Sequence, residues 1–287
     1  MSTSFPFQED CVSEKPDEPR ACRRPVDVVA ASRPYATDRT IRSLPVSWQE
    51  FYEARYVSKA SGSLRRSTAL RRAEHLRIER VIRTLIPVQT STTVLDIGAG
   101  RASYLNDADV TALDISDEAL SGSPRNRRVL GQADALPFDD ASFDIVVCSQ
   151  VLEHVPNWRS AVSEMARVAR SGGLVFVAVP NRYALMKRRY HALERSIDRA
   201  GHIHEFREAE LYFALMERGL DGLNAQGACY DVWWLLASLE RSRRAERWIP
   251  VIDKVPEKAL AKVLYFDGQW RRRKLSGLSL EVWGFKR

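Results

Sequence analysis

The sequence predicts an α/β fold in which a parallel sheet is covered by helices on both faces. From residue 93 to residue 180, short apolar segments with strand character alternate with helical patterns, as in β-α-β crossover units. The composition, with 45% hydrophobic and 28% charged residues, is that of an ordinary globular protein. No apolar segment approaches the length of about 18 residues that a membrane span needs.

The N-terminal region divides into a tail and a helical cap. Residues 1–45 hold six of the thirteen prolines and show no helical or strand period, which predicts a disordered tail. The domain is expected to span residues 46–287 and to begin with a helical cap at 46–90. Within this cap, apolar side chains from Ser67 to Leu85 follow the helical period, arginines fill the other face, and Pro87 ends the helix.

Residues 91–180 are predicted to form the core of the domain. Five strands are expected, at Thr93–Ile97, Val110–Leu113, Arg128–Leu130, Phe143–Cys148 and Leu174–Val179. Between the first two strands, Arg101–Leu105 leaves room for only a brief helix. Ser116 is an N-cap that starts a second helix. A third helix is expected from Trp158 to Ala169, closed by the Gly172-Gly173 pair as a helix C-cap.

Residues 181–287 continue the alternation of helices and strands. A helix is predicted at Glu205–Arg218 and a strand at Leu223–Ala228. The chain ends with Ser279–Lys286, whose period-two alternation predicts an edge strand. Between these strands, residues 230–266 are helical in pattern and rich in Trp and Arg, which predicts a helical insert that covers the substrate or packs as a subdomain.

A strand that runs into a glycine turn carries the strongest chemical signal. Gly98 and Gly100 let a ligand approach the backbone, and the free N–H groups there attract an anionic group. Asp96 precedes this turn, and Asp114 ends the next strand, where a carboxylate suits the hydroxyls of a ribose. A dinucleotide-binding fold would share Asp114 but would have Gly or Ala in place of Ser103. An acid beside the turn suits a cationic ligand end better than a pyrophosphate.

Further motifs follow in a fixed order after these two acids. They are Ala133-Asp-Ala-Leu-Pro-Phe138, Ser142-Phe-Asp-Ile-Val146, Leu152-Glu-His-Val155 and the Arg167-to-Val177 segment with its two glycines. With them, the run from Val94 to Pro180 resembles class I S-adenosylmethionine-dependent methyltransferases. It is most similar to the ubiquinone-biosynthesis-like, or type 11, group. The resemblance implies a doubly wound, Rossmann-like, mostly parallel sheet of seven strands, with S-adenosylmethionine as the cofactor.

The resemblance also implies a role for each matching position. Methionine-end contacts would come from Asp96, Gly98 and Gly100, a ribose contact from Asp114, adenine contacts from Ile115, Asp134 and Ala135, and a contact at the reaction centre from Ser149. Two departures stand out. Ala102 replaces the third glycine of the family, and only eighteen residues separate the first two acids, so the first helix should be about one turn short. Trp48, Tyr52 and Tyr56 either cover the side opened in this way or pack as part of the leading helix.

The acceptor is expected to be a small molecule, namely a metabolite, a lipid-linked compound or a sugar, methylated at oxygen. Removing a proton from oxygen needs a base, and the candidates are His154 and His204. His202, His204 and Glu205 do not have the i, i+4 spacing of a helical ligand pair, and no third ligand is nearby, so no metal is expected.

Charge leaves other functions open. Residues 181–287 carry twenty-one basic and fourteen acidic residues and hold the entire net charge of +7. This excess fits an anionic small molecule, a peripheral membrane contact or a solvated face. It also fits an RNA methyltransferase, against which stands the absence of an RNA-binding module and of an Asn/Asp-Pro-Pro-Tyr/Phe tetrad after the fourth strand. A third alternative is a cofactor-binding partner protein without transfer activity.

The remaining features concern location and assembly. The four cysteines are scattered without the spacing of a zinc site or a disulfide framework. The N-terminal residues have no basic start and no apolar run of a secretory signal. A cytoplasmic protein is therefore expected, and the sequence leaves its oligomeric state open.

Overall fold

The computed structural model describes residue 50 and residues 64–102, 104–181, 203–228, 255–256, 258–263 and 279–287. Several predictions lie outside these described residues. They are the disordered tail at 1–45, the aromatic residues Trp48, Tyr52 and Tyr56, the histidine His202, and most of the insert at 230–266.

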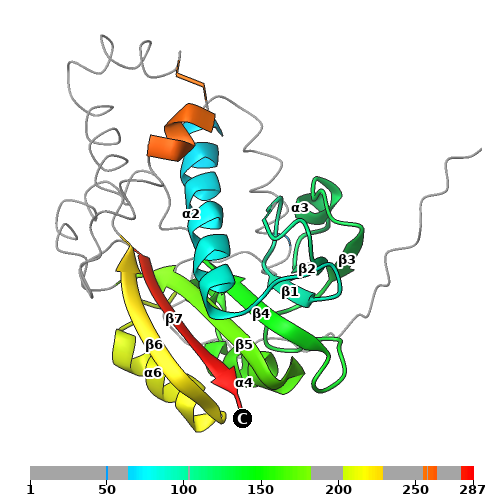
Figure 1. Ribbon diagram of the computed structural model, residues 1–287, viewed down its shortest axis with the longest axis vertical. Coiled ribbons are helices and arrows are strands. Elements are labelled where there is room, and N and C mark those ends of the chain that lie inside the picture. The colour runs from blue at the N-terminus through cyan, green and yellow to red at the C-terminus, as the bar shows by residue number, and fades with distance from the viewer. Residues whose placement is uncertain are drawn as a thin grey trace, which may run out of the picture.

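A seven-stranded sheet forms the centre of the domain, in the order β3-β2-β1-β4-β5-β7-β6 (Figure 1). The strands are β1 (Thr93–Ile97), β2 (Asp109–Asp114), β3 (Arg127–Leu130), β4 (Phe143–Ser149), β5 (Ala169–Pro180), β6 (Leu220–Ala228) and β7 (Ser279–Lys286). The first five pair in parallel, and β7 is antiparallel to both of its neighbours. The strand order reverses between β1 and β4. This confirms the doubly wound fold and its seven strands.

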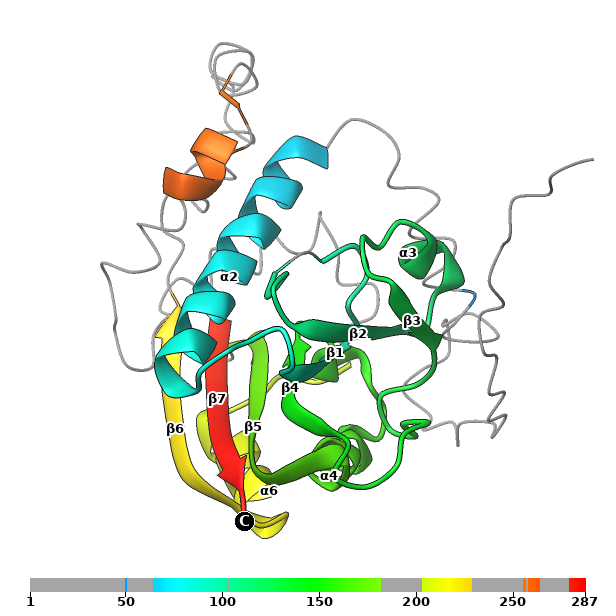
Figure 2. The same cartoon turned by 45° about the vertical axis from the view of Figure 1, so that its right-hand side comes forward.

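Helices cover both faces of the sheet. One face carries α2 (Leu64–Leu85) and α3 (Asp117–Ser121), whereas the other carries α4 (Trp158–Val168) and α6 (Glu208–Glu217). In Figures 1 and 2, α2 lies across the sheet on the side opposite to α4 and α6. The predicted N-cap of α3 is confirmed, because the Ser116 hydroxyl accepts a hydrogen bond from the Ala119 N–H.

The packing of α2 confirms most of its apolar stripe and corrects one part of it. Ile78 and Ile82 are buried against strand residues that include Val94 and Phe176. The prediction that arginines fill only the solvent face was wrong. Arg77 is buried with the apolar stripe because Glu281 of β7 supplies its countercharge.

The pair Gly172-Gly173 lies in β5 and does not cap α4. That helix ends at Val168, with Ala169 as its cap, and β5 begins at once. Between Ala169 and Leu174 the register of β5 against β4 shifts, which requires irregular backbone. Gly172 accordingly has a φ of 77°, and a Cβ on Gly173 would lie 2.9 Å from the Arg170 carbonyl oxygen.

The last strand, β7, is also not the predicted edge strand. It lies between β5 and β6, and its residues from Ser279 to Gly284 are buried. The alternation of residue types along β7 therefore reflects two buried faces with different surroundings rather than one buried and one solvent-exposed face. Leu280 and Val282 pack into the α4 and α6 side, whereas Glu281 lies on the α2 side with Arg77.

The described residues of Arg101–Leu105 do not form the brief helix predicted there. Among the described residues between Ile97 and Asp109 there is a turn at Gly100, and the chain then runs without helix through Tyr104 and Leu105. Leu105 has a φ of 52°. Both side chains are buried in the cluster that α2 forms with the sheet, so α2 and these two residues cover the surface beside β1. The connection was predicted to hold a helix about one turn short, whereas its described residues form no helix.

No helix in the described part of the chain is long and apolar enough to cross a membrane.

Candidate functional site

Parallel pairing brings the sequence-predicted acids to one edge of the sheet. Asp96 lies near the end of β1, where it pairs with Ala112 of β2 on one side and with Val147 of β4 on the other. Asp114 ends β2 and Ser149 ends β4. The carboxyl ends of these strands meet where the strand order reverses, which is the usual position of a ligand site in such sheets.

The glycine turn after β1 is fixed by close packing. Gly98 and Gly100 have φ values of 68° and 50°, which favour glycine. A Cβ on Gly98 would lie only 2.2 Å from Cγ2 of Val151, which follows β4. The turn after β1 is therefore pressed against the segment after β4, and a larger residue at position 98 would separate them.

Asp114 ties this turn to the end of β2. Its Oδ2 accepts a hydrogen bond from the Gly100 N–H at 2.8 Å, and its Oδ1 accepts one from the Ser116 N–H at 3.0 Å. The side chain is buried. Ile115, the next residue, is half-buried at the same edge. Asp114 thus holds the turn in shape while its carboxylate lies at the end of the strand.

Asp96 is a buried carboxylate that is only half satisfied. The residue is 3% exposed, and its Oδ1 accepts a hydrogen bond of 2.7 Å from the Tyr104 hydroxyl. Its Oδ2 is buried and has no hydrogen-bond partner among the described residues. Burial raises the pKa of Asp96 to about 7, although the Tyr104 hydrogen bond and the charge of Arg125 act in the opposite direction. A buried polar atom without a partner is costly, so this oxygen fits the ammonium group of a ligand.

Tyr104 was missed by the sequence reasoning. Its side chain is 3% exposed and lies between α2 and the sheet, where the ring of His75 is 5.0 Å away between centroids. Burial and the neighbouring Asp96 raise the pKa of Tyr104 well above its usual value, so the phenol stays protonated and donates. The signal that could have found it is the shortness of the connection itself, because a chain without room for a helix must fill the space with large side chains.

A second loop approaches the edge between β3 and β4. It contains Asp134, which is half-buried, and Ala135, which is exposed. The pKa of Asp134 is raised by burial, against a hydrogen bond from the Asn157 side chain. The Gln132 carbonyl accepts the Ala135 N–H in a turn. The loop therefore presents one partly desolvated carboxylate near the ends of the strands.

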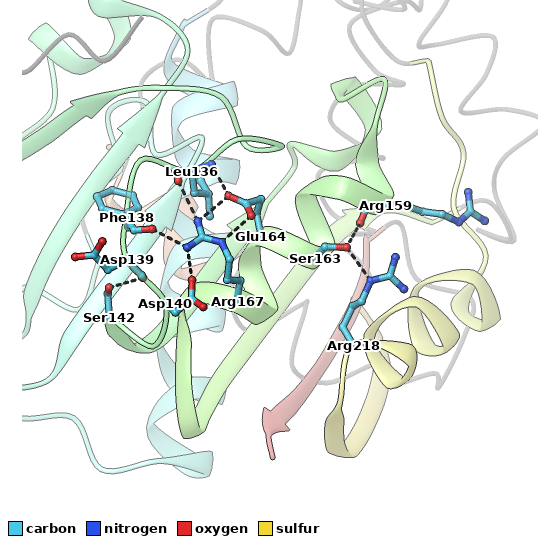
Figure 3. Close-up of polar contacts among 10 residues, drawn as sticks. All are labelled: Leu136, Phe138, Asp139, Asp140, Ser142, Arg159, Ser163, Glu164, Arg167 and Arg218. Atoms are coloured by element: carbon cyan, nitrogen blue, oxygen red, sulfur yellow. Dashed lines mark hydrogen bonds and ion pairs between the residues drawn. The ribbon is translucent and has the colours of Figure 1, made fainter. Parts of the chain in front are cut away.

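An arginine on α4 holds this loop in place (Figure 3). Arg167 donates two hydrogen bonds of 2.8 Å to the carboxylate of Glu164, one turn away. It also donates to the carbonyl oxygens of Leu136 and Phe138 and to the carboxylate of Asp140, at 3.1, 2.8 and 2.8 Å. Glu164 in turn accepts the Leu136 N–H at 2.8 Å. These contacts were not anticipated from the sequence.

The two candidate histidines approach the segment after β4 from different parts of the chain. His154 ends the short helix η1 (Leu152–His154), and its Nε2 lies 3.7 Å from Oε1 of Glu153. The N–H groups of Ile203 and His204 donate to the Glu153 carbonyl oxygen at 2.9 and 3.2 Å. The Nε2 of His204 donates to the Pro156 carbonyl oxygen at 3.2 Å. The structure thus places both half-buried histidines beside one turn.

No group of three or more metal-ligating side chains occurs within the described ranges.

Comparison with known proteins assigns the region that carries this site. The sequence profile described as "Methyltransferase domain" matches residues 95–177, from β1 into β5. Residues 95–177 form a class I S-adenosylmethionine-dependent methyltransferase domain. The glycine turn, both buried acids, the Asp134 loop and the η1 turn all lie within the matched residues. Segment 203–228 and β7 lie outside them.

Two relatives are similar to this chain over about half of its length. The 27-O-demethylrifamycin SV methyltransferase of Amycolatopsis mediterranei is 30% identical over 154 residues, which are 47% of this chain and 54% of that protein. A ubiquinone biosynthesis O-methyltransferase of Xylella fastidiosa is 30% identical over 162 residues, 49% of this chain and 65% of that protein. The chain spans about half the length of the curated relatives it matches.

A solved structure extends the likeness of fold beyond these segments. A SAM-dependent methyltransferase from Thermotoga maritima matches with a TM-score of 0.55 at 17% identity. The match covers 83% of this chain and 99% of that one. At this identity the likeness concerns the fold, and it agrees with the seven-stranded sheet described above.

Proposed function

We propose that the protein transfers the methyl group of S-adenosylmethionine to a small-molecule acceptor, at an oxygen atom. The observation that carries this proposal is the buried Oδ2 of Asp96, which has no partner among the described residues and lies just before the glycine turn. A carboxylate so placed can neutralise the ammonium group of the cofactor. The methyltransferase domain supports the same cofactor.

Each predicted cofactor residue has a role that suits its position. When bound, the cofactor supplies an electrophilic methyl group on a sulfonium. Asp96 would accept from the ammonium group, and the turn at Gly98 and Gly100 would contact the methionine end. Asp114 would accept from the ribose hydroxyls. The remaining expected contacts are Ile115, Asp134 and Ala135 with the adenine, and Ser149 at the reaction centre.

The protein's contribution to the chemistry would be positioning and the exclusion of water. An oxygen acceptor also requires a base, and we favour His204 over His154. Because Nε2 of His204 donates to the Pro156 carbonyl, the neutral ring carries its lone pair on Nδ1. That nitrogen is then able to accept a proton.

The choice of oxygen is supported by the names of two relatives. One is called a 27-O-demethylrifamycin SV methyltransferase and another a ubiquinone biosynthesis O-methyltransferase. The acceptors in these names belong to those proteins. For this chain we propose only an oxygen of a metabolite, lipid-linked compound or sugar, with a cytoplasmic location and without a nucleic-acid partner.

The test is to incubate the full chain with S-adenosylmethionine labelled in the methyl group and with fractionated metabolite extracts. We expect label in a small molecule. We also expect His204→Ala to lower the rate of transfer at least about tenfold while leaving cofactor affinity unchanged. His154→Ala tests the other candidate base in the same way, and transfer at the parent rate in both variants would mean that neither histidine is the base. Binding of the cofactor without transfer to any fraction would favour the cofactor-binding partner protein, and labelled RNA would favour an RNA methyltransferase.

A further inference from the structure

We propose that Tyr104 is a positioning residue for the cofactor: its hydroxyl occupies Oδ1 of Asp96 and so reserves Oδ2 for the cofactor's ammonium group. This inference rests on the proposed function. It concerns a residue outside the glycine turn, in a segment that was expected to be helical and is not.

The hydrogen bond between Tyr104 and Asp96 is short and buried. The Tyr104 hydroxyl is 2.7 Å from Oδ1 of Asp96, and both residues are 3% exposed. A hydrogen bond to a carboxylate is stronger than one between neutral groups, and it fixes the carboxylate's rotation. Because the phenol has one proton to donate, it satisfies one oxygen only. The second oxygen is then held in a single orientation rather than averaged over several.

Tyr104 is itself held from two sides. Arg125, in the loop before β3, donates to the Tyr104 carbonyl oxygen and, at 3.0 Å, to Oδ1 of Asn106. The ring of His75 on α2 packs on the Tyr104 ring. Burial lowers the pKa of His75 to about 4, so this ring is neutral at pH 7. The tyrosine is therefore positioned by α2 and by the loop before β3.

The groups around Asp96 set its pKa and should therefore make the affinity for the cofactor depend on pH. Tyr104 and Arg125 lower its pKa, whereas burial and Asp114 raise it, and the buried thiol of Cys148 on β4 stays protonated. The balance lies at about 7. Binding an ammonium group requires the ionised carboxylate, so affinity should rise with pH up to about 7 and then level off. Removing the Tyr104 hydroxyl should move this rise to higher pH.

The test compares the binding of two ligands to the unmodified full chain and to three variants of it. S-adenosylhomocysteine carries the amino-acid group, and 5′-methylthioadenosine lacks it. We expect Tyr104→Phe to weaken the first ligand about tenfold at pH 7, or about 1.4 kcal/mol, and the second by less than about twofold. Tyr212→Phe on α6 makes the same chemical change on the opposite face and should alter neither affinity. Asp96→Asn should weaken only S-adenosylhomocysteine and abolish its pH dependence between pH 5.5 and 7.5.

Several results would overturn the inference. Equal losses for both ligands in Tyr104→Phe would mean that the residue only supports the fold. An unchanged affinity and pH profile for S-adenosylhomocysteine would mean that the hydroxyl does not act on the site. If the unmodified chain bound neither ligand, the proposed function itself would fall, and this inference with it.

Discussion

Two carboxylates are buried on the same face of the sheet beneath α2, and their surroundings differ. Glu281 of β7 is paired with Arg77 of α2, and its Oε2 accepts a hydrogen bond of 2.8 Å from the Gln226 amide. Among the described residues, the carboxylate of Asp96 on β1 accepts a hydrogen bond only from the Tyr104 phenol. The side chains of Arg77 and Glu281 are 4% and 2% exposed, so Glu281 is buried about as completely as Asp96. What differs is the countercharge.

This difference separates a structural carboxylate from one kept for a ligand. The Arg77–Glu281 pair joins α2 to the end of the chain and is complete without any other molecule. The Asp96 site is at the carboxyl edge of the strands and carries an electrostatic cost until a cation arrives. The same sheet face thus contains one carboxylate that stabilises the fold and one that weakens it in favour of binding.

The largest expected effect on stability comes from breaking the Arg77–Glu281 ion pair. Arg77→Met leaves the Glu281 carboxylate buried without its countercharge and should lower the free energy of unfolding by about 3–5 kcal/mol. The double variant Arg77→Met with Glu281→Leu should recover most of this loss. Denaturant unfolding of both variants measures the difference. A loss below about 1 kcal/mol in the single variant would show that the pair does not hold α2 on the sheet.

At Asp96, by contrast, removing the charge is expected to raise the free energy of unfolding. The Asp96 carboxyl titrates near 3.8 when unfolded and near 7 when folded, so its stabilising contribution is complete below pH 3.8 and is lost as pH rises through 7. Without ligand, Asp96→Asn should therefore raise the free energy of unfolding at pH 8 by about 2 kcal/mol, and this gain should fade towards pH 5. Unfolding curves at several pH values measure it.

The exposed carboxylate Asp107 provides the control for that experiment. Its pKa is lowered by the hydrogen bond with Arg83. Asp107→Asn should accordingly give no stability gain at pH 8. A gain of equal size in both variants, or a gain for Asp96→Asn that does not depend on pH, would contradict the view that burial of an unpaired charge is the cause.

The smallest effect is expected at the loop that carries Asp134. Arg167→Met removes the contacts that hold this loop on α4, so S-adenosylhomocysteine affinity should fall about fivefold, or about 1 kcal/mol. Arg218→Met is a matched control, because Arg218 donates to Ser163 on another side of α4 and does not touch the loop (Figure 3). Calorimetry of both variants compares them, and equal affinities would indicate that the loop keeps its place without Arg167.

The sequence predicted those parts of the site that depend on where strands end. Asp96, Gly98 and Asp114 lie at one edge because parallel pairing of β1 and β2 leaves them no other place. Tyr104 could not be predicted, since it depends on a connection whose path is set by α2 and by the loop before β3. The Arg77–Glu281 pair was missed for the same reason, because its partners come from opposite ends of the chain.

Local patterns also misled where a neighbouring strand decided the outcome. A double glycine after a helix is typical of a C-cap, yet Gly172 and Gly173 serve a register shift between β4 and β5. Period-two alternation in Ser279–Lys286 suggested an edge strand, but β7 pairs with β6 as well as with β5, and Arg77 of α2 pairs with Glu281 on one of its faces. In both cases the deciding contacts are distant in the sequence.

The central claim is that the carboxyl edge of β1 and β2 binds S-adenosylmethionine, and a calorimetric titration of the full chain with S-adenosylhomocysteine tests it most directly. The account predicts binding at one site, weakened at least about tenfold, or about 1.4 kcal/mol, by Asp114→Ala. The absence of any detectable binding by the unmodified, folded chain would contradict it, as would an affinity that Asp114→Ala leaves unchanged.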